Sequence, residues 1–131
     1  MTERKIALIT GASRGIGLCC AKELAEAGCD IIINDICTEE QAMPALNEIR
    51  ACGVDAYFYS FDVSDFDAVG ENITKIIEKH GKIDVLVNNA GITKDGLFVR
   101  MTPEQWEKVI KINLTSVYCM SHHVIKHMMK A

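Results

Sequence analysis

Residues 6–17, Ile-Ala-Leu-Ile-Thr-Gly-Ala-Ser-Arg-Gly-Ile-Gly, decide how this chain folds. The apolar run 6–9 predicts a short buried strand, and the glycines that follow predict a turn into a helix over residues 15–27, which Gly28 ends. Without side chains, a loop backbone can approach a pyrophosphate and present to it the free N–H groups of the helix. A plain strand-to-helix turn needs one glycine and not three. The loop therefore predicts a nucleotide site with the candidate residues Gly11, Ser13, Arg14, Gly15, Ile16 and Gly17.

Outward from this loop, short apolar runs alternate with longer amphipathic stretches. Further strands are predicted over residues 31–34, 56–61 and 84–87. Helices are predicted from a capping box at Thr38 to near Gly53, and from Ser64 or Asp65 to His80. A long helix opens at Thr102, with Pro103 as its first residue. This alternation predicts an α/β fold in which a doubly wound parallel sheet has helices on both faces, in one domain over residues 1–131.

Composition excludes several classes of protein. Lys plus Arg total 14 against 18 for Asp plus Glu, which gives a net charge of −4 and offers nucleic acid no basic surface. No apolar run approaches the ~20 residues that span a bilayer, and the apolar run after the start is too short for a signal peptide, so we expect a cytoplasmic protein. The 6 cysteines form no C-x-x-C pair and are expected to be free thiols.

Asp35 lies at the end of the second predicted strand, 18 positions beyond Gly17. An acidic side chain at this place can accept hydrogen bonds from the adenosine ribose hydroxyls of a dinucleotide, and its charge repels a 2′-phosphate. Asp35 therefore favours NAD. The guanidinium of Arg14 could bind that phosphate and favours NADP. The alternative is that Asp35 is an exposed turn residue without a ligand.

The third and fourth predicted strands end in polar residues at the same edge of the sheet, where ligands of doubly wound folds bind. The carboxylate of Asp62 could accept from an adenine amino group, beside the backbone of Val63. The fourth strand runs into Asn88-Asn89-Ala90-Gly91. One of these asparagines could tie neighbouring strands together, because buried amides need partners. Ala90 and Gly91 would then let the ribose and the nicotinamide approach.

Together, these motifs resemble the short-chain dehydrogenase/reductase family. The stretch 88–101, NNAGITKDGLFVRM, is similar in detail to bacterial 3-oxoacyl-acyl-carrier-protein reductases. The resemblance covers essentially the whole chain. It implies a Rossmann-type fold, an NAD or NADP cofactor, and hydride transfer between a carbonyl and an alcohol. It assigns cofactor-binding roles to the glycine loop and to Asp35, Asp62, Val63, Asn89, Ala90 and Gly91. The possible substrates include an acyl-carrier-protein thioester.

Asn113 interrupts an apolar stripe on the last predicted helix, which contains Trp106, Ile110, Val117, Met120, Val124 and Met128. Burying an amide without partners costs roughly 1–3 kcal/mol, so a specific role is expected. The resemblance implies that Asn113 is catalytic, opening the helix locally and holding a water of a proton relay. The alternative is a buried asparagine that bonds to nearby backbone.

The same helix carries a second constellation. Cys119, His123 and His127 stand four positions apart and could hold zinc if a fourth ligand arrived. Because no H-E-x-x-H pattern is present and basic neighbours crowd this face, we expect no metal here but a solvated or subunit-facing surface.

The family's Tyr-x-x-x-Lys pair and upstream Ser are missing. The residues four positions beyond the three tyrosines are Phe61, Val63 and His122. Members of the family are about twice as long, so the resemblance implies an N-terminal half that stops after the fourth strand and its helix. Two hypotheses follow. The chain is part of an active ketoreductase, or it is an inactive nucleotide-binding fragment. Assembly into a homo-oligomer, common in the family, is also expected.

Overall fold

The computed structural model describes residues 3–93 and 95–131. The first elements are β1 (Ile6–Thr10), α1 (Gly15–Glu26), β2 (Asp30–Asp35), α2 (Glu39–Arg50), β3 (Ala56–Ser60), α3 (Phe66–His80) and β4 (Val85–Val87). They are followed by a 3₁₀ turn η1 (Phe98–Arg100), helix α4 (Pro103–Ile110), a π-helical turn η2 (Lys111–Thr115) and helix α5 (Ser116–Lys130). The predicted strand bounds each lie within one residue of these.

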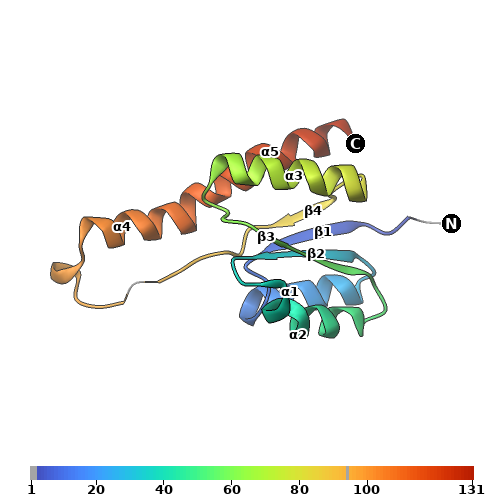
Figure 1. The fold of residues 1–131 in the computed structure, drawn as a ribbon, viewed down its shortest axis with the longest axis horizontal. Coiled ribbons are helices and arrows are strands. Elements are labelled where there is room, and N and C mark those ends of the chain that lie inside the picture. The colour runs from blue at the N-terminus through green and yellow to red at the C-terminus, as the bar shows by residue number, and fades with distance from the viewer. Residues whose placement is uncertain (1–2, 94) are drawn as a thin grey trace.

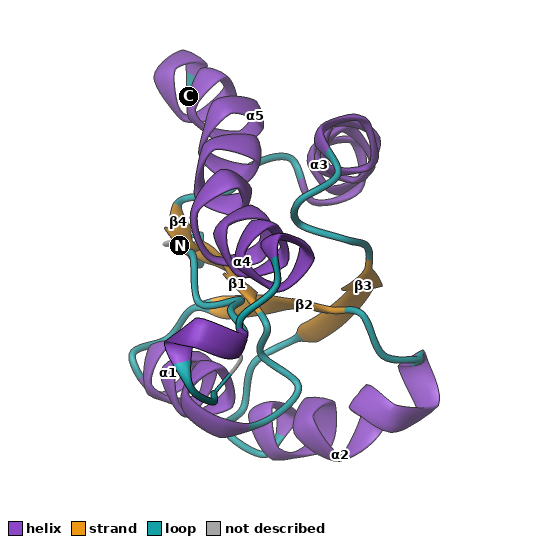
Figure 2. Ribbon diagram, turned by 90° about the vertical axis from the view of Figure 1, so that its left-hand side faces the viewer, coloured by secondary structure: helices purple, strands orange, loops and turns teal. Residues whose placement is uncertain are grey.

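The strands form one parallel sheet in the order β3-β2-β1-β4. Leu8 of β1 pairs with Ile32 of β2 on one side and with Leu86 of β4 on the other. Helices α1 and α2 cover one face of the sheet, and α3 and α5 cover the opposite face (Figures 1 and 2). The predicted α/β class, with a Rossmann-type, doubly wound parallel sheet in three layers, is confirmed.

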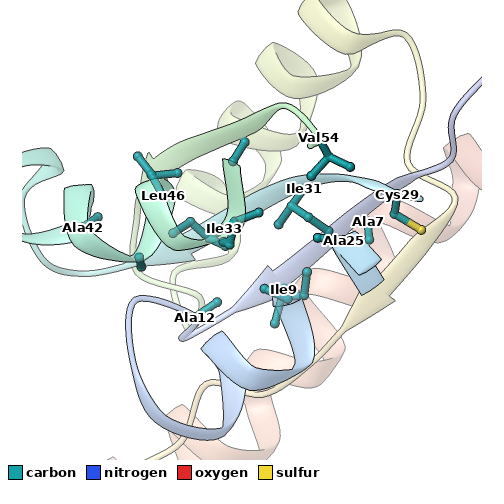
Figure 3. Packing of buried hydrophobic residues seen from close by; sticks show 14 residues of the cluster. Ala7, Ile9, Ala12, Ala25, Cys29, Ile31, Ile33, Ala42, Leu46 and Val54 are labelled. Atoms are coloured by element: carbon teal, nitrogen blue, oxygen red, sulfur yellow. The ribbon is translucent and has the colours of Figure 1, made fainter. Parts of the chain in front are cut away.

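Alternate side chains of the central strands enter two separate cores. Ala7 and Ile9 of β1 join Ile31 and Ile33 of β2 in a cluster beneath α1 and α2 (Figure 3). Leu8 and its neighbours on the other face pack under α3 and α5. Because successive side chains of a strand point to opposite faces, a shift of one residue would exchange the two cores. The mostly buried central strands β1 and β2 therefore hold their carboxyl ends in a fixed register.

Local hydrogen bonds set where the helices begin and end. The Gln41 N–H donates to Thr38 Oγ1 at 3.2 Å, and the Thr38 N–H donates back to Gln41 Oε1 at 3.0 Å, which completes the predicted capping box. Of the two predicted caps for α3, Asp65 is the one used, since its carboxylate accepts the Ala68 N–H at 3.1 Å. Gly81 ends α3 with a φ of 88°.

The last helical region is less buried than its apolar stripe predicts. The π-helical turn η2 separates α4 from α5, and α4 extends beyond the end of the sheet (Figure 1). Here Trp106 is 55% exposed and Asn113 is exposed. The predicted burial of both residues is wrong. Only the part of the stripe that lies over the sheet is buried, including Met120 and Val124. No described helix is long and apolar enough to cross a membrane.

Candidate functional site

A cavity of about 340 Å³ lies at the carboxyl ends of the strands. The predicted site residues on its wall are Gly11, Arg14, Asp35, Asp62, Val63, Asn89, Ala90 and Gly91. The structure thus brings together residues from four separate loops. Gly15 and Ile16 lie outside this wall and line a shallow hollow along α1. Ser13 and Asn113 are also outside it, but each bonds to a residue of the wall.

The glycine loop leaves no room for a side chain at Gly11 or at Gly17. Gly11 has a φ of 62°, and a Cβ atom there would lie 2.9 Å from the Ala90 Cα. A Cβ atom on Gly17 would lie 2.5 Å from both the Gly11 carbonyl oxygen and the Asn89 Nδ2 atom. No side chain caps the start of α1, so its first N–H groups are left for a ligand. This backbone cradle fits a pyrophosphate, because the positive end of the helix dipole favours an anion there.

Thr10 and Asn89 lock the loop after β4 to the glycine loop. The Thr10 Oγ1 atom accepts the N–H groups of Asn89 at 3.0 Å and Ala90 at 2.9 Å. The Asn89 side chain donates to the Gly11 carbonyl at 3.1 Å. Asn88 turns away and donates to Ser121 Oγ at 3.3 Å. Asn89 is therefore the asparagine that ties the two strands together, as one of the pair was expected to do.

Asp35 is half-buried at the wall of the cavity and makes three hydrogen bonds. Its Oδ2 atom accepts the Ser13 N–H at 3.2 Å and also the Ser13 hydroxyl. Its Oδ1 atom accepts the Ile36 N–H at 2.8 Å. Arg14, on the same cavity wall, is exposed. Asp35 is thus a carboxylate held by three hydrogen bonds at the cavity wall.

Asp62 and Val63 form the adjoining part of the wall. Although desolvation by partial burial raises the pKa of Asp62, hydrogen bonds from the side chain and backbone of Ser64 and the charge of Lys111 outweigh it, and the pKa lies below its usual value. The Ser64 N–H donates to Asp62 Oδ1 at 2.9 Å. Asp62 is therefore an ionised acceptor near neutral pH, beside the buried Val63.

Asn113 lies on the π-helical turn η2, where the family resemblance implied a local opening of the helix. Its Oδ1 atom accepts the Ile92 N–H at 2.7 Å, and its Nδ2 atom donates to the Ile92 carbonyl at 2.8 Å. A Cβ atom on Gly91 would lie 3.1 Å from the same Oδ1. The amide thus bonds to backbone, as the alternative interpretation had it, but it does so at the surface. It fixes the segment that borders the cavity.

Sequence reasoning missed several residues of the cavity wall, among them Lys108 and Ile112. They lie four positions apart near the junction of α4 and η2, a spacing that places side chains on one helix face. Ile112 directly precedes Asn113 in the sequence, and Lys108 lies one helical turn before Ile112, so the candidate role of Asn113 was a usable signal for both. Lys108 adds a second cation to a wall that already contains Arg14 and two carboxylates.

The residues of the possible zinc site have other partners. Burial raises the pKa of the Cys119 thiol, whose Sγ atom lies 3.9 Å from the Ser64 carbonyl oxygen. The His123 Nε2 atom lies 3.0 Å from the Phe66 carbonyl oxygen. Across residues 3–93 and 95–131, no group of three or more metal-ligating side chains is found. All six cysteines are free thiols.

Comparison with known proteins agrees with this geometry. Residues 5–131 match the family described as short chain dehydrogenase. The 3-oxoacyl-[acyl-carrier-protein] reductase FabG of Chlamydia pneumoniae is 42% identical over 127 residues, which make up 97% of this chain and 51% of that protein. The chain thus spans about half the length of the curated relatives it matches.

Solved structures show the same fold. Xylitol dehydrogenase bound to NAD⁺ matches with a TM-score of 0.90 at 32% identity, over 96% of this chain and 48% of that one. A metagenomic short-chain oxidoreductase in complex with NADP matches with a TM-score of 0.89 at 33% identity, over 96% of this chain and 57% of that one. The glycine loop, the strand order and these matches lead to one conclusion: the chain belongs to the short-chain dehydrogenase family.

Proposed function

We propose that this chain is the dinucleotide-binding part of an NAD(P)-dependent oxidoreductase that interconverts a ketone and a secondary alcohol. One observation carries the proposal: the glycine loop, the carboxylates of Asp35 and Asp62 and the Asn89 loop border a single cavity. The similarity to FabG supports a 3-oxoacyl thioester, carried on acyl carrier protein, as the substrate class. A bound nicotinamide would supply or accept the hydride.

Each part of the wall has a defined task in this proposal. The loop from Gly11 to Gly17 and the start of α1 hold the pyrophosphate. Asp35 accepts from the adenosine ribose, and Asp62 with Val63 borders the adenine. Asn89, Ala90 and Gly91 border the ribose and nicotinamide. Asn113, through its two bonds to Ile92, fixes the backbone beside the reacting groups and takes part in proton transfer.

NAD is the proposed preferred cofactor. The carboxylate of Asp35 is held at the cavity wall and would repel a 2′-phosphate, whereas Arg14 is exposed and makes no ion pair within the described residues. Asp35→Ala should weaken NADH binding by about 1–3 kcal/mol, the value of a hydrogen bond to a charged group, and reduce discrimination against NADPH.

Fluorescence titration of both reduced cofactors tests the site and the preference together. Asp55→Ala is the matched control, because Asp55 is an exposed carboxylate at the opposite edge of the sheet, beside the start of β3. It should bind both cofactors as the wild type does. If the wild type binds neither cofactor, the proposed function is wrong. If Asp35→Ala leaves the preference unchanged, another group such as Arg14 sets it.

A second candidate function is cofactor binding without catalysis. The observation in its favour is that these 131 residues contain no Tyr-x-x-x-Lys pair. A tyrosine hydroxyl has a pKa of ~10 and needs a nearby ammonium before it can exchange protons near neutrality. The two candidates share the binding site, and both predict no turnover for these 131 residues by themselves. A substrate-dependent assay separates them when the chain is joined to a segment that supplies a Tyr-x-x-x-Lys pair.

The proposed partner in assembly is a second copy of the chain. Helix α5 buries one flank against α3 and the sheet, while Tyr118, Ile125 and Met129 are 59%, 51% and 79% exposed on another. The edge of β4 away from β1 has no neighbouring strand among the described residues. Exposed apolar surface and open strand edges favour association. Light scattering at micromolar concentration should show a species larger than a monomer, and a clean monomer would contradict this.

A further inference from the structure

A second cavity, of about 310 Å³, lies at the amino ends of the strands, opposite the dinucleotide cavity. Its floor is apolar and consists of Ile6 at the start of β1 and the buried Ile32 of β2. Tyr57 of β3 and His80 at the end of α3 add aromatic rings. The remaining residues of this amino-end cavity are charged: Glu3, Arg4, Asp30 and Lys79. The volume reaches the range of small-molecule sites, ~300–1,000 Å³.

The aromatic side of the amino-end cavity is held in place and carries no charge near neutral pH. The ring centroids of Tyr57 and His80 lie 4.4 Å apart, and the Tyr59 hydroxyl lies 3.1 Å from His80 Nε2. Burial, and then the charge of Lys79, lower the pKa of His80, and the opposing charge of Asp30 does not outweigh them. The imidazole is therefore neutral at pH 7, so this side offers a ligand uncharged aromatic surface.

The charges around the amino-end cavity do not balance. The carboxylate of Asp30 accepts from Arg4 Nη1 at 3.0 Å. Glu3 has an 83% exposed side chain and lies 3.8 Å from the ammonium of Lys82. Lys79 makes no ion pair within residues 3–93 and 95–131, and its ammonium lies 5.1 Å from the centroid of a tyrosine ring of the cavity. Both carboxylates thus have cationic partners, and one positive charge is left over.

We propose that the amino-end cavity binds a small aromatic carboxylate. The ring of the ligand lies over the apolar floor and beside Tyr57, where burial of apolar area favours it. Its carboxylate meets the ammonium of Lys79 and the guanidinium of Arg4, which has five N–H donors and uses only Nη1 for Asp30. The amino-end cavity shares no residue with the dinucleotide cavity, so this inference does not depend on the proposed function.

Calorimetric titration with 2-naphthoate tests the proposal, and 2-naphthamide is the matched uncharged probe. The wild type should bind naphthoate at least about tenfold more tightly than naphthamide. Lys79→Gln and Arg4→Gln should each weaken naphthoate binding, by about tenfold for Lys79→Gln, because each removes a charged donor. Lys75→Gln is the control variant. Lys75 is an exposed lysine one turn earlier in α3 and outside the amino-end cavity, so this variant should bind naphthoate as the wild type does.

Nuclear magnetic resonance places the bound probe. Naphthoate should shift the ring signals of His80 and leave those of His127, on α5, unchanged, and saturating NADH should not displace it. Circular dichroism checks that the variants, which replace exposed side chains, are folded. The proposal is wrong if millimolar naphthoate does not bind, if naphthamide binds equally well, if neither substitution changes the affinity, or if NADH displaces the probe. A chain that binds naphthoate in this way but binds no NADH would support this inference and contradict the proposed function.

Discussion

Replacing Gly17 by alanine tests whether the glycine loop is packed as tightly as the structure shows. The new Cβ atom would lie 2.5 Å from the Gly11 carbonyl oxygen, 2.5 Å from Asn89 Nδ2 and 2.9 Å from the Ala12 Cα. Two of these atoms belong to the backbone, so the loop itself must move. Overpacking costs about 1–3 kcal/mol, and losing the Asn89–Gly11 hydrogen bond costs about 0.5–1.5 kcal/mol. The better helix propensity of alanine offsets this loss of unfolding free energy by up to about 1 kcal/mol. The expected net loss of unfolding free energy is about 0.5–4.5 kcal/mol.

Urea unfolding and NADH titration measure the two consequences. The displaced loop should also weaken NADH binding, on the order of tenfold or more, because the pyrophosphate has to approach the same backbone. Gly28→Ala is the matched control at the other end of α1. Its φ is 98° and no atom lies within 4 Å of the added Cβ, so it costs stability through backbone strain alone and should not change NADH binding. A folded Gly17→Ala variant that binds NADH as the wild type does would refute the reasoning.

Three further predictions concern stability, pH and turnover. Thr10→Val should lower the unfolding free energy by about 2–4 kcal/mol in a urea titration, because the N–H groups of Asn89 and Ala90 lose their acceptor; Thr10→Ser keeps it and should be close to wild type. Burial, and then the charge of Lys79, lower the pKa of His80 from its ordinary 6.5, so the unfolded state takes up a proton first as the pH falls. The unfolding free energy should therefore decrease below about pH 6.5, and less steeply in His80→Gln; equal slopes would show that His80 does not contribute. The purified chain should show no oxidation of NADH or NADPH that depends on a 3-oxoacyl thioester, and turnover in a preparation free of host reductase would contradict this.

The sequence alone determined the features that depend on neighbouring residues. Thr38 and Gln41 form the predicted capping box because the bonded groups lie three positions apart. The glycine loop was readable for the same reason, since a turn that must bring backbone close to a ligand tolerates few side chains. The alternation of apolar strands with amphipathic helices was enough to predict a parallel sheet.

Only the tertiary structure decided which distant groups meet and which surfaces are covered. Asn89 donates to Gly11 across 78 positions, and Ser13 meets Asp35 across 22. No local pattern encodes these pairs, because they depend on the register of neighbouring strands. Trp106 belongs to a helical apolar stripe and is nevertheless exposed. The apolar periodicity of a sequence identifies one face of a helix, but whether that face is buried depends on how far the sheet extends beneath it. Helix α4 lies beyond the end of this sheet (Figure 1).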